Sequence, residues 1–312
     1  MNKSAVRRNA HAGFLFGEPE DFYAVPEFAG SAESPLNESL LAFKSNLHSA
    51  IQIANIPYEL AHGAVLRQRF HSLLTAERIL NVKHMENGER DEEGEARARE
   101  IARKRMSEEL RREEIIALHA EETLNRLDEH LSIGGFALSA EELLRQVLIV
   151  AWGAFESFVS DILRKTLNSR GELIFRMNEN SRFREITSGS TIINHIKTNG
   201  FDISNCMGDI FIDKYRIDSI EKMREVCSIL LGSKEFDQIL NGSKYWMIYQ
   251  QRNLIVHRRG IVDKWFQENT SSIEPLGSQI KFDSSYIEEV LISLRDAGVA
   301  LYRAANRALG GS

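Results

Sequence analysis

The sequence predicts an all-α protein, with a helical bundle and a small β-hairpin in its C-terminal half and a helical extension before it. None of the five prolines falls between residues 58 and 274, and a proline inside a helix costs about 3 kcal/mol. Over most of that stretch, apolar residues recur at three- and four-residue steps. That spacing places them on one face of a helix.

Length and composition exclude several classes of protein. The 312 residues carry a formal charge of −6, so the surface as a whole is not suited to coating nucleic acid or an anionic membrane, although a local basic pocket is compatible with it. The only two cysteines, Cys206 and Cys227, exclude a disulfide scaffold and a four-cysteine zinc site. They fit a reducing compartment, and we expect a cytoplasmic protein. No apolar run approaches the roughly 18–20 residues that span a bilayer, and we expect no membrane partner.

The N-terminal third divides into an arm and an extension. Residues 1–36 hold three of the five prolines and scattered aromatics, which indicates an irregular arm, either a disordered tail or a segment that docks on the body or a partner. A helix follows Pro35, with Leu40, Phe43 and Leu47 on one face. Pro57 ends this helix or starts the next one, which predicts two antiparallel helices with a tight link.

A charged stretch completes the extension, which we assign to residues 37–135. Asn87-Gly88 indicates a turn. One long helix is expected over 95–131, where four apolar residues are spaced by seven: Leu110, Ala117, Leu124 and Leu131. Such heptads predict coiled-coil-like packing, and an ordinary amphipathic helix on the body is the alternative. Gly134-Gly135 is the expected boundary with a second domain, residues 136–312.

Helix signals in this second domain begin with Ser139 and Glu142, which fit a capping box. Residues 147–162 are apolar nearly all round, so we expect other elements to surround this helix, with a close helix approach at Gly153. Further helices are expected over 217–231 and 244–257, the second ended by Gly260. The segments IVDKWF and QIKF predict the two hairpin strands, and Ser285 with Glu288 predicts a second capping box for a last helix to about Leu309.

The segment from Tyr249 to Asp263 carries the candidate chemistry. At about 100° per residue, Met247, Leu254 and Ile255 share one side of a helix, which should face the core. The opposite side gathers Trp246, Tyr249, Asn253 and His257, and Arg252 at the edge can reach them. Histidine exchanges protons near neutral pH, since its usual pKa is roughly 6.5, and arginine binds phosphate in a bidentate manner. These groups suit cleavage of RNA by its own 2′-OH, with acid–base help and a cation at phosphorus.

This segment resembles the HEPN family. Arg252-Asn253-Leu254-Ile255-Val256-His257 fits the R-x4-6-H signature of that family, with its common R-N start. The stretch IVDKWF…QIKFDSSYIEEVL is similar to the HEPN subgroup with a small hairpin before the last helix (RiboL-PSP/MAE-like), and WGAFESFVSDIL is similar to that subgroup's first helix. The resemblance covers about residues 138–310 and leaves residues 1–135 out.

The resemblance implies a dimer that joins two such motifs in one cleft, and a metal-independent endoribonuclease without cofactor, of the kind found in toxin or anti-phage systems. It makes Arg252 and His257 catalytic, with Asn253 in support. Some HEPN toxins carry a tyrosine two residues after the histidine, which their partner modifies; the residue here is Arg259, so such a partner is not expected. An antitoxin or defence-system partner would instead bind the N-terminal helices.

Plainer interpretations stand beside these. Arg252 can form a structural ion pair, and the carboxylate of Glu156 in the apolar helix is its candidate partner; Glu156 and Tyr249 would then support the site. Trp246 can stack on an RNA base or lie in the dimer interface. Arg258, Arg259 and Lys264 are phosphate contacts or solvated charges. The histidines show no metal-ligand spacing, and we expect no metal.

The alternative function is a non-catalytic HEPN module for dimerisation or RNA binding, with the N-terminal helices as the interaction surface.

Overall fold

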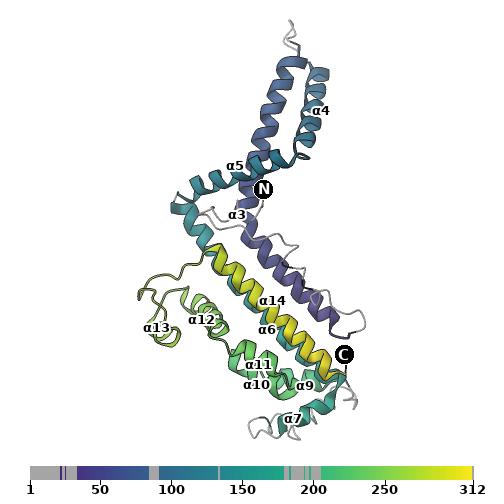
Figure 1. The fold of residues 1–312 in the computed structure, drawn as a ribbon, viewed down its shortest axis with the longest axis vertical. Coiled ribbons are helices and arrows are strands. Elements are labelled where there is room, and N and C mark those ends of the chain that lie inside the picture. The colour runs from purple at the N-terminus through teal and green to yellow at the C-terminus, as the bar shows by residue number, and fades with distance from the viewer. Residues whose placement is uncertain are drawn as a thin grey trace. The chain divides into compact units, whose positions relative to one another are not determined.

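Helices make up the regular structure of the part of the chain that can be described (Figure 1). The structure, a computed structural model, describes residues 22, 25, 34–83, 91–132, 134–178, 183, 193, 197 and 205–310; the predicted arm lies almost wholly outside them. The α-helices are α3 (Asn37–Asn81), α4 (Glu92–Glu109), α5 (Glu113–Leu131), α6 (Gly134–Ser169), α7 (Phe175–Asn178), α9 (Met207–Lys214), α10 (Ile220–Leu231), α11 (Lys234–Leu240), α12 (Ser243–Arg258), α13 (Lys264–Thr270) and α14 (Ser284–Ala308), with a 3-10 helix η2 (Gly171–Ile174). Within the described ranges the all-α class is confirmed.

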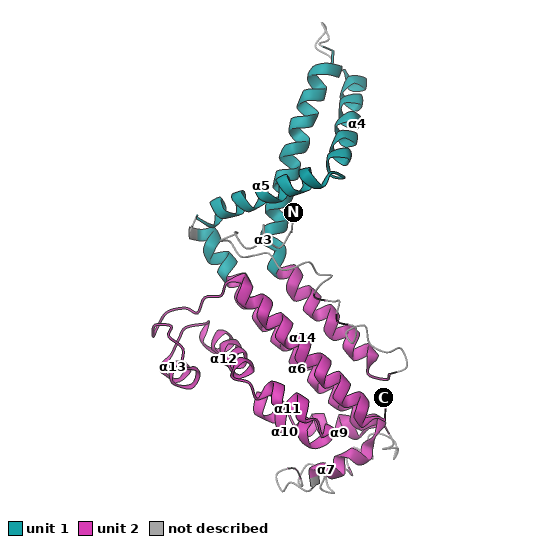
Figure 2. Cartoon of the chain, in the orientation of Figure 1, with its two compact units in different colours: residues 1–15, 54–141 teal, residues 16–53, 142–312 magenta. Residues whose placement is uncertain are grey.

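The chain divides into two compact units (Figure 2). Unit 1 takes residues 54–141, and unit 2 takes residues 16–53 together with 142–312. The sequence-based division placed residues 37–53 in the extension, whereas the structure places them in unit 2. The reason is a buried aromatic contact, because Phe43 stacks on Phe158 of α6 with ring centroids 4.5 Å apart.

Helix α3 passes through Pro57 without ending, so the predicted break there is wrong. Proline has no N–H for the carbonyl four residues earlier, which is that of Ile53. The division between the units falls at this same point, between Ile53 and Ala54. Buried residues on both sides, including Ile51 and Ala61, keep the helix continuous despite the lost bond.

The long helix predicted over 95–131 is two helices. Helix α4 ends at Leu110, and Arg112 adopts an extended conformation before α5 begins, so the heptad row crosses a break and does not form one stripe. Instead α4 lies along the second half of α3. Their shared core contains Leu73, Leu74, Ala98 and Ala102, and ion pairs flank it between Arg69 and Glu109, Arg78 and Glu95, and Arg105 and Glu77.

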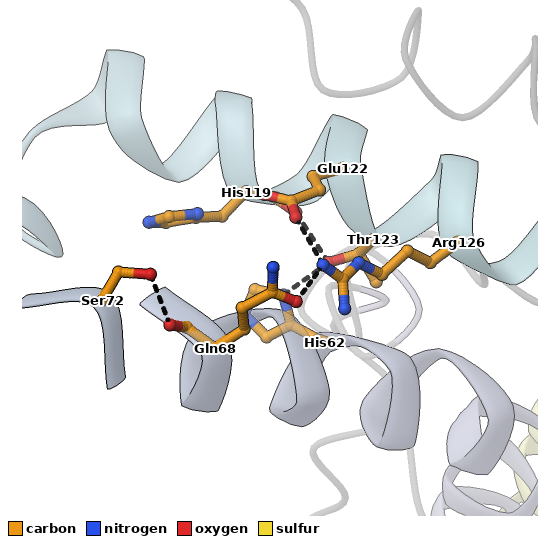
Figure 3. A network of polar contacts seen from close by, with 7 residues as sticks. All are labelled: His62, Gln68, Ser72, His119, Glu122, Thr123 and Arg126. Atoms are coloured by element: carbon orange, nitrogen blue, oxygen red, sulfur yellow. Dashed lines mark hydrogen bonds and ion pairs between the residues drawn. The ribbon is translucent and has the colours of Figure 1, made fainter. Parts of the chain in front are cut away.

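A polar network joins α3 to α5 in unit 1 (Figure 3). The hydroxyl of Thr123 donates to the carbonyl of His119 at 2.6 Å and lies 3.0 Å from Nδ1 of His62. Because the single hydroxyl proton goes to the carbonyl, Nδ1 of His62 must be the donor in the second bond. The ring of His119 is buried, and neither of its nitrogens has a hydrogen-bond partner among the described residues. Unit 1 therefore holds one half-buried histidine with a hydrogen-bond partner and one buried histidine without one among the described residues.

We predict that His62 makes the fold sensitive to acid. Burial lowers its pKa, the Glu59 carboxylate opposes this effect, and His119 adds to the lowering. A histidine with a lowered folded pKa stabilises the protein above its unfolded pKa of roughly 6.5, and this stability is lost as the pH falls through the folded value. His62→Gln keeps a donor for Thr123 without titrating, so its free energy of unfolding should change less between pH 7 and pH 5. Denaturant titrations at both values measure this, and His71→Gln, exposed on the same helix, should behave like the unchanged protein.

Unit 2 is built round α6, as its apolar sequence predicts. The largest side chains of this helix, Trp152, Phe155 and Phe158, are buried. Helix α3 covers one side through Phe43, and α12 covers another through Tyr249, whose ring lies 5.6 Å from that of Trp152. Helix α14 contacts α10 and α11, and its Ser293 carbonyl accepts a 2.9 Å hydrogen bond from the hydroxyl of Tyr245 on α12.

By length and composition alone, α6 could also cross a membrane, although the sequence holds no uninterrupted apolar run of that length. More than half of its most apolar window is buried inside the structure. The same composition is expected of a helix at the centre of a bundle, and it is therefore weak evidence for a membrane span.

The predicted β-hairpin is wrong for the described residues. Ile261 and Gln279 form one isolated antiparallel bridge, and no strand is present in the described ranges. The residues expected to extend the first strand form α13 instead, because Asp263 caps a helix there by accepting a 2.8 Å hydrogen bond from the N–H of Phe266. The Asp263 carboxylate accepts from a backbone N–H in the first turn of α13, a donor that would have paired with a neighbouring strand in a hairpin.

Both predicted capping boxes are also wrong. Ser139 lies inside α6 and donates back to the carbonyl of Gly135, because the helix already begins at Gly134. Helix α14 is capped by Asp283, which accepts a 2.7 Å hydrogen bond from the N–H of Tyr286. Ser285 donates to that same carboxylate, so aspartate takes the role assigned to serine.

Two glycines inside helices of unit 2, Gly153 and Gly298, should respond to alanine with opposite signs. The expected close approach at Gly153 is absent, since an added Cβ would meet nothing within 4 Å. Gly153→Ala should therefore stabilise the protein by about 0.5–1 kcal/mol through helix propensity. A Cβ on Gly298 would collide with the buried ring of Phe43, and Gly298→Ala should destabilise by about 1–3 kcal/mol. Equilibrium unfolding of the two variants measures both, and equal signs would contradict this packing.

Candidate functional site

Helix α12 carries the predicted site and ends in a left-handed turn. Arg259 has φ 55° and Gly260 has φ 74°, and the N–H groups of both donate to the carbonyl of Leu254. These two hydrogen bonds to one carbonyl end the helix. The turn leaves His257, Arg258 and Arg259 exposed.

The predicted core face of α12 is largely confirmed, since Leu254 and Ile255 are buried while Met247 is half-buried. The opposite face is less open than expected. Tyr249 is half-buried against Trp152, and its hydroxyl donates to the carbonyl of Asp218 at 3.3 Å. Trp246 is likewise half-buried, and its indole N–H donates to the carbonyl of Asn269 at 3.2 Å. Both aromatic residues tie α12 to its neighbours.

Arg252 is held by two partners. Its Nη2 donates to the Glu156 carboxylate at 3.2 Å, and its Nη1 donates to the side-chain oxygen of Asn253 at 3.0 Å. The side chains of Arg252 and Glu156 are only 25% and 20% exposed. The predicted ion pair between α12 and α6 is therefore confirmed.

The electrostatics of Glu156 show that its pairing is incomplete. Burial raises the pKa of this carboxyl, and Trp152 and Arg252 lower it without cancelling that effect, while Asp218 adds to the rise. An ionised carboxylate here stays costly even with its guanidinium partner, which is common for buried pairs.

His257 lies one helical turn beyond Asn253 and is exposed. It makes no hydrogen bond or ion pair with another described residue, and Asn253 uses its side-chain oxygen on Arg252. The predicted trio is thus split into a braced pair, Arg252 and Asn253, and an imidazole free to meet a ligand. Sequence spacing could place these residues on one helix, but it could not show which of them bond to one another.

The predicted basic residues are all at the surface. Arg258 lies 3.8 Å from the Asp263 carboxylate, and Lys264 lies 3.5 Å from that of Glu268. The guanidinium of Arg259 has no partner among the described residues. These charges remain accessible to an anion or a base.

Two clefts flank these residues within unit 2. One of about 660 Å³ is lined by Arg252 and Glu156, and also by Ser39, Asp161 and Arg164. The other, of about 450 Å³, is lined by Arg259 and by residues of α6 and the segment before α14. Sequence reasoning missed the lining residues because they come from separate segments and carry no local motif.

No protein-family model, no curated protein and no solved structure matches the chain. Across the described ranges, no group of three or more His, Cys, Asp and Glu side chains is arranged to hold a metal ion.

The ion pair between Arg252 and Glu156 should respond unequally to loss of either partner. Arg252→Ala leaves Glu156 half-buried without its cation and should destabilise by about 1–3 kcal/mol. Glu156→Gln keeps an oxygen for Arg252 and removes a carboxylate that resists ionisation, so it should be neutral or stabilising. Lowering the pH toward the raised pKa of Glu156 should shrink the Arg252→Ala loss, since a protonated carboxyl needs no cation. Chemical unfolding at pH 7 and pH 5 tests this, and a loss independent of pH would contradict it.

Proposed function

We propose that the chain is a metal-independent endoribonuclease of the HEPN type that it resembles. The observation that carries the proposal is Arg252, braced by Glu156 and Asn253 at 3.2 and 3.0 Å, on the same helix as the exposed His257 five residues later. A fixed guanidinium and a free imidazole on one helix suit RNA cleavage by the adjacent 2′-OH.

In this proposal each residue has a distinct task. His257 exchanges the proton of the 2′-OH or of the leaving 5′-oxygen, and Arg252 stabilises the negative charge that develops at phosphorus. Glu156 and Asn253 position Arg252, while Tyr249 and Trp246 position α12. Arg258 and Lys264 contribute positive charge along the RNA backbone.

The Arg252–His257 motif of one copy offers only one histidine, whereas cleavage benefits from both an acid and a base. We therefore propose a homodimer that brings two His257 side chains to one cleft. The biological setting that fits is a cytoplasmic toxin or anti-phage effector, with the unit 1 helices binding an antitoxin or another defence-system partner.

One observation favours a second candidate, a non-catalytic module for dimerisation or RNA binding. His257 makes no hydrogen bond or ion pair with another described residue, so no described neighbour positions its ring. Unit 1 exposes large apolar side chains on α3, with Ile79 78% and Leu80 73% exposed, and such residues suit a protein partner.

The proposed chemistry predicts the products. Cleavage should persist in EDTA and leave a 2′,3′-cyclic phosphate and a 5′-OH, while DNA and RNA with a 2′-O-methyl group at the scissile position should stay intact. His257→Ala should lower the rate by about 10²–10⁴-fold and change stability by no more than about 0.5 kcal/mol, since the residue is exposed. Arg252→Ala should be inactive and also less stable. Cleavage at the full rate by His257→Ala would leave the binding module as the better account.

The proposed assembly predicts a two-fold dimer at micromolar concentration. Light scattering of the purified chain measures its mass directly, and a strict monomer that still cleaves RNA would rule out the shared cleft. Mixing unchanged chains with an excess of His257→Ala chains should lower activity by more than dilution, because mixed dimers would carry one imidazole.

A further inference from the structure

We propose that the cleft between α6 and the C-terminal end of α12 binds a guanine base, and that Arg259 recognises it. This inference rests on the proposed function, because it takes RNA as the ligand. It assigns the smaller cleft as a base-binding site beside His257.

The lining of this cleft suits a flat, partly apolar ligand. Ile149, Ile255 and Val256 provide an apolar surface, and four polar side chains surround it: Glu142, Gln146, Arg259 and Gln279. A phosphate would lie against aliphatic carbons and near the Glu142 carboxylate, which disfavours it. A nucleobase has apolar faces and polar edges, so it satisfies both kinds of surface.

The polar groups around the cleft leave a definite pattern of open donors and acceptors. Gln146 donates from its amide nitrogen to Glu142 at 2.7 Å, and Gln279 donates to the carbonyl of Arg259 at 3.0 Å. Both glutamines therefore present their amide oxygens as acceptors, while the Arg259 guanidinium presents donors. Guanine has the matching edges, because O6 and N7 accept from arginine and its N1–H and N2–H₂ groups donate.

The backbone of Arg259 gives an independent reason to expect a ligand there. Its φ of 55° lies in the left-handed region, and among the described residues only Ser271, at 53°, shares this property without being glycine. Glycine is the usual residue at such a helix end. Strained positions persist mainly where the side chain is needed, and the Arg259 side chain has no structural partner among the described residues.

The position of Arg259 fits recognition next to the cut. It follows His257 by two residues in the same helix end. Val256 and Arg259, which line the cleft, stand on either side of His257 in the sequence, so we infer that a base held there brings a neighbouring phosphate of the RNA toward this histidine.

The test measures binding in the His257→Ala background, where RNA is not cleaved. The probes are single-stranded oligouridine with one central guanosine, the same strand with 7-deazaguanosine, which lacks N7, and the strand with adenosine. Fluorescence anisotropy should show binding to the guanosine strand about tenfold tighter than to either of the others. Arg259→Gly should abolish this preference, because the donors to O6 and N7 are then lost.

A matched pair of variants separates binding from fold. Both Arg259→Gly and Ser271→Gly relieve a left-handed backbone, so each should raise the Tm by about 2–4 °C. Only Arg259→Gly should change RNA binding, since Ser271 lies outside the cleft lining.

The outcomes are distinguishable from failure of the proposed function. A guanosine preference that depends on Arg259, in a chain that cuts no RNA, would support the base site and reject the ribonuclease. RNA cleavage with equal binding of the three strands would retain the ribonuclease and overturn the base site. An unchanged guanosine preference in Arg259→Gly would show that Arg259 does not read the base and would likewise overturn the guanine assignment.

Discussion

The interaction on which the candidate site depends is the ion pair between Glu156 and Arg252. Helix α6 is apolar and mostly surrounded, so a carboxylate within it requires a cation from a neighbouring helix. Helix α12 supplies that cation and is thereby fixed in rotation about its own axis. With Arg252 turned toward α6, His257 is left at the surface and Arg259 lies at the helix end. The arrangement of Arg252, His257 and Arg259 on α12 thus follows from the free-energy cost of burying the Glu156 carboxylate.

Much of unit 2 follows from sequence periodicity, and the pairing of Glu156 with Arg252 follows from the same reasoning. A carboxylate such as Glu156 in an apolar helix predicts a partner, and Arg252 of the candidate motif was the arginine proposed for it. What local patterns could not supply was the identity of tertiary neighbours. Gly153 resembles a packing glycine, yet the close approach occurs at Gly298, because that position depends on where Phe43 of a distant helix lies.

Errors in the helix boundaries share a related cause. Pro57 removes one backbone hydrogen bond from α3. Buried contacts on both sides outweigh this loss, so the proline does not end the helix. The opposite happens at Arg112, where no proline or glycine predicts an end, yet α4 stops and α5 starts. The expected hairpin became α13 because Asp263 could cap a helix. At Pro57 packing overrules the local preference, and at Asp263 one side-chain hydrogen bond does, whereas the break at Arg112 has no side-chain cap.

The placement of the first half of α3 has a consequence for how the protein is made. Phe43 contacts Phe158 and lies against Gly298, residues that a ribosome adds much later. Residues 54–141 of unit 1 are contiguous and can fold as soon as they emerge. The apolar face formed by Leu40, Phe43 and Leu47 must wait, exposed, until nearly the whole chain has been synthesised. Such distant pairing is slow and leaves a surface open to aggregation, so this short helical segment is where we expect the nascent chain to depend most on chaperones.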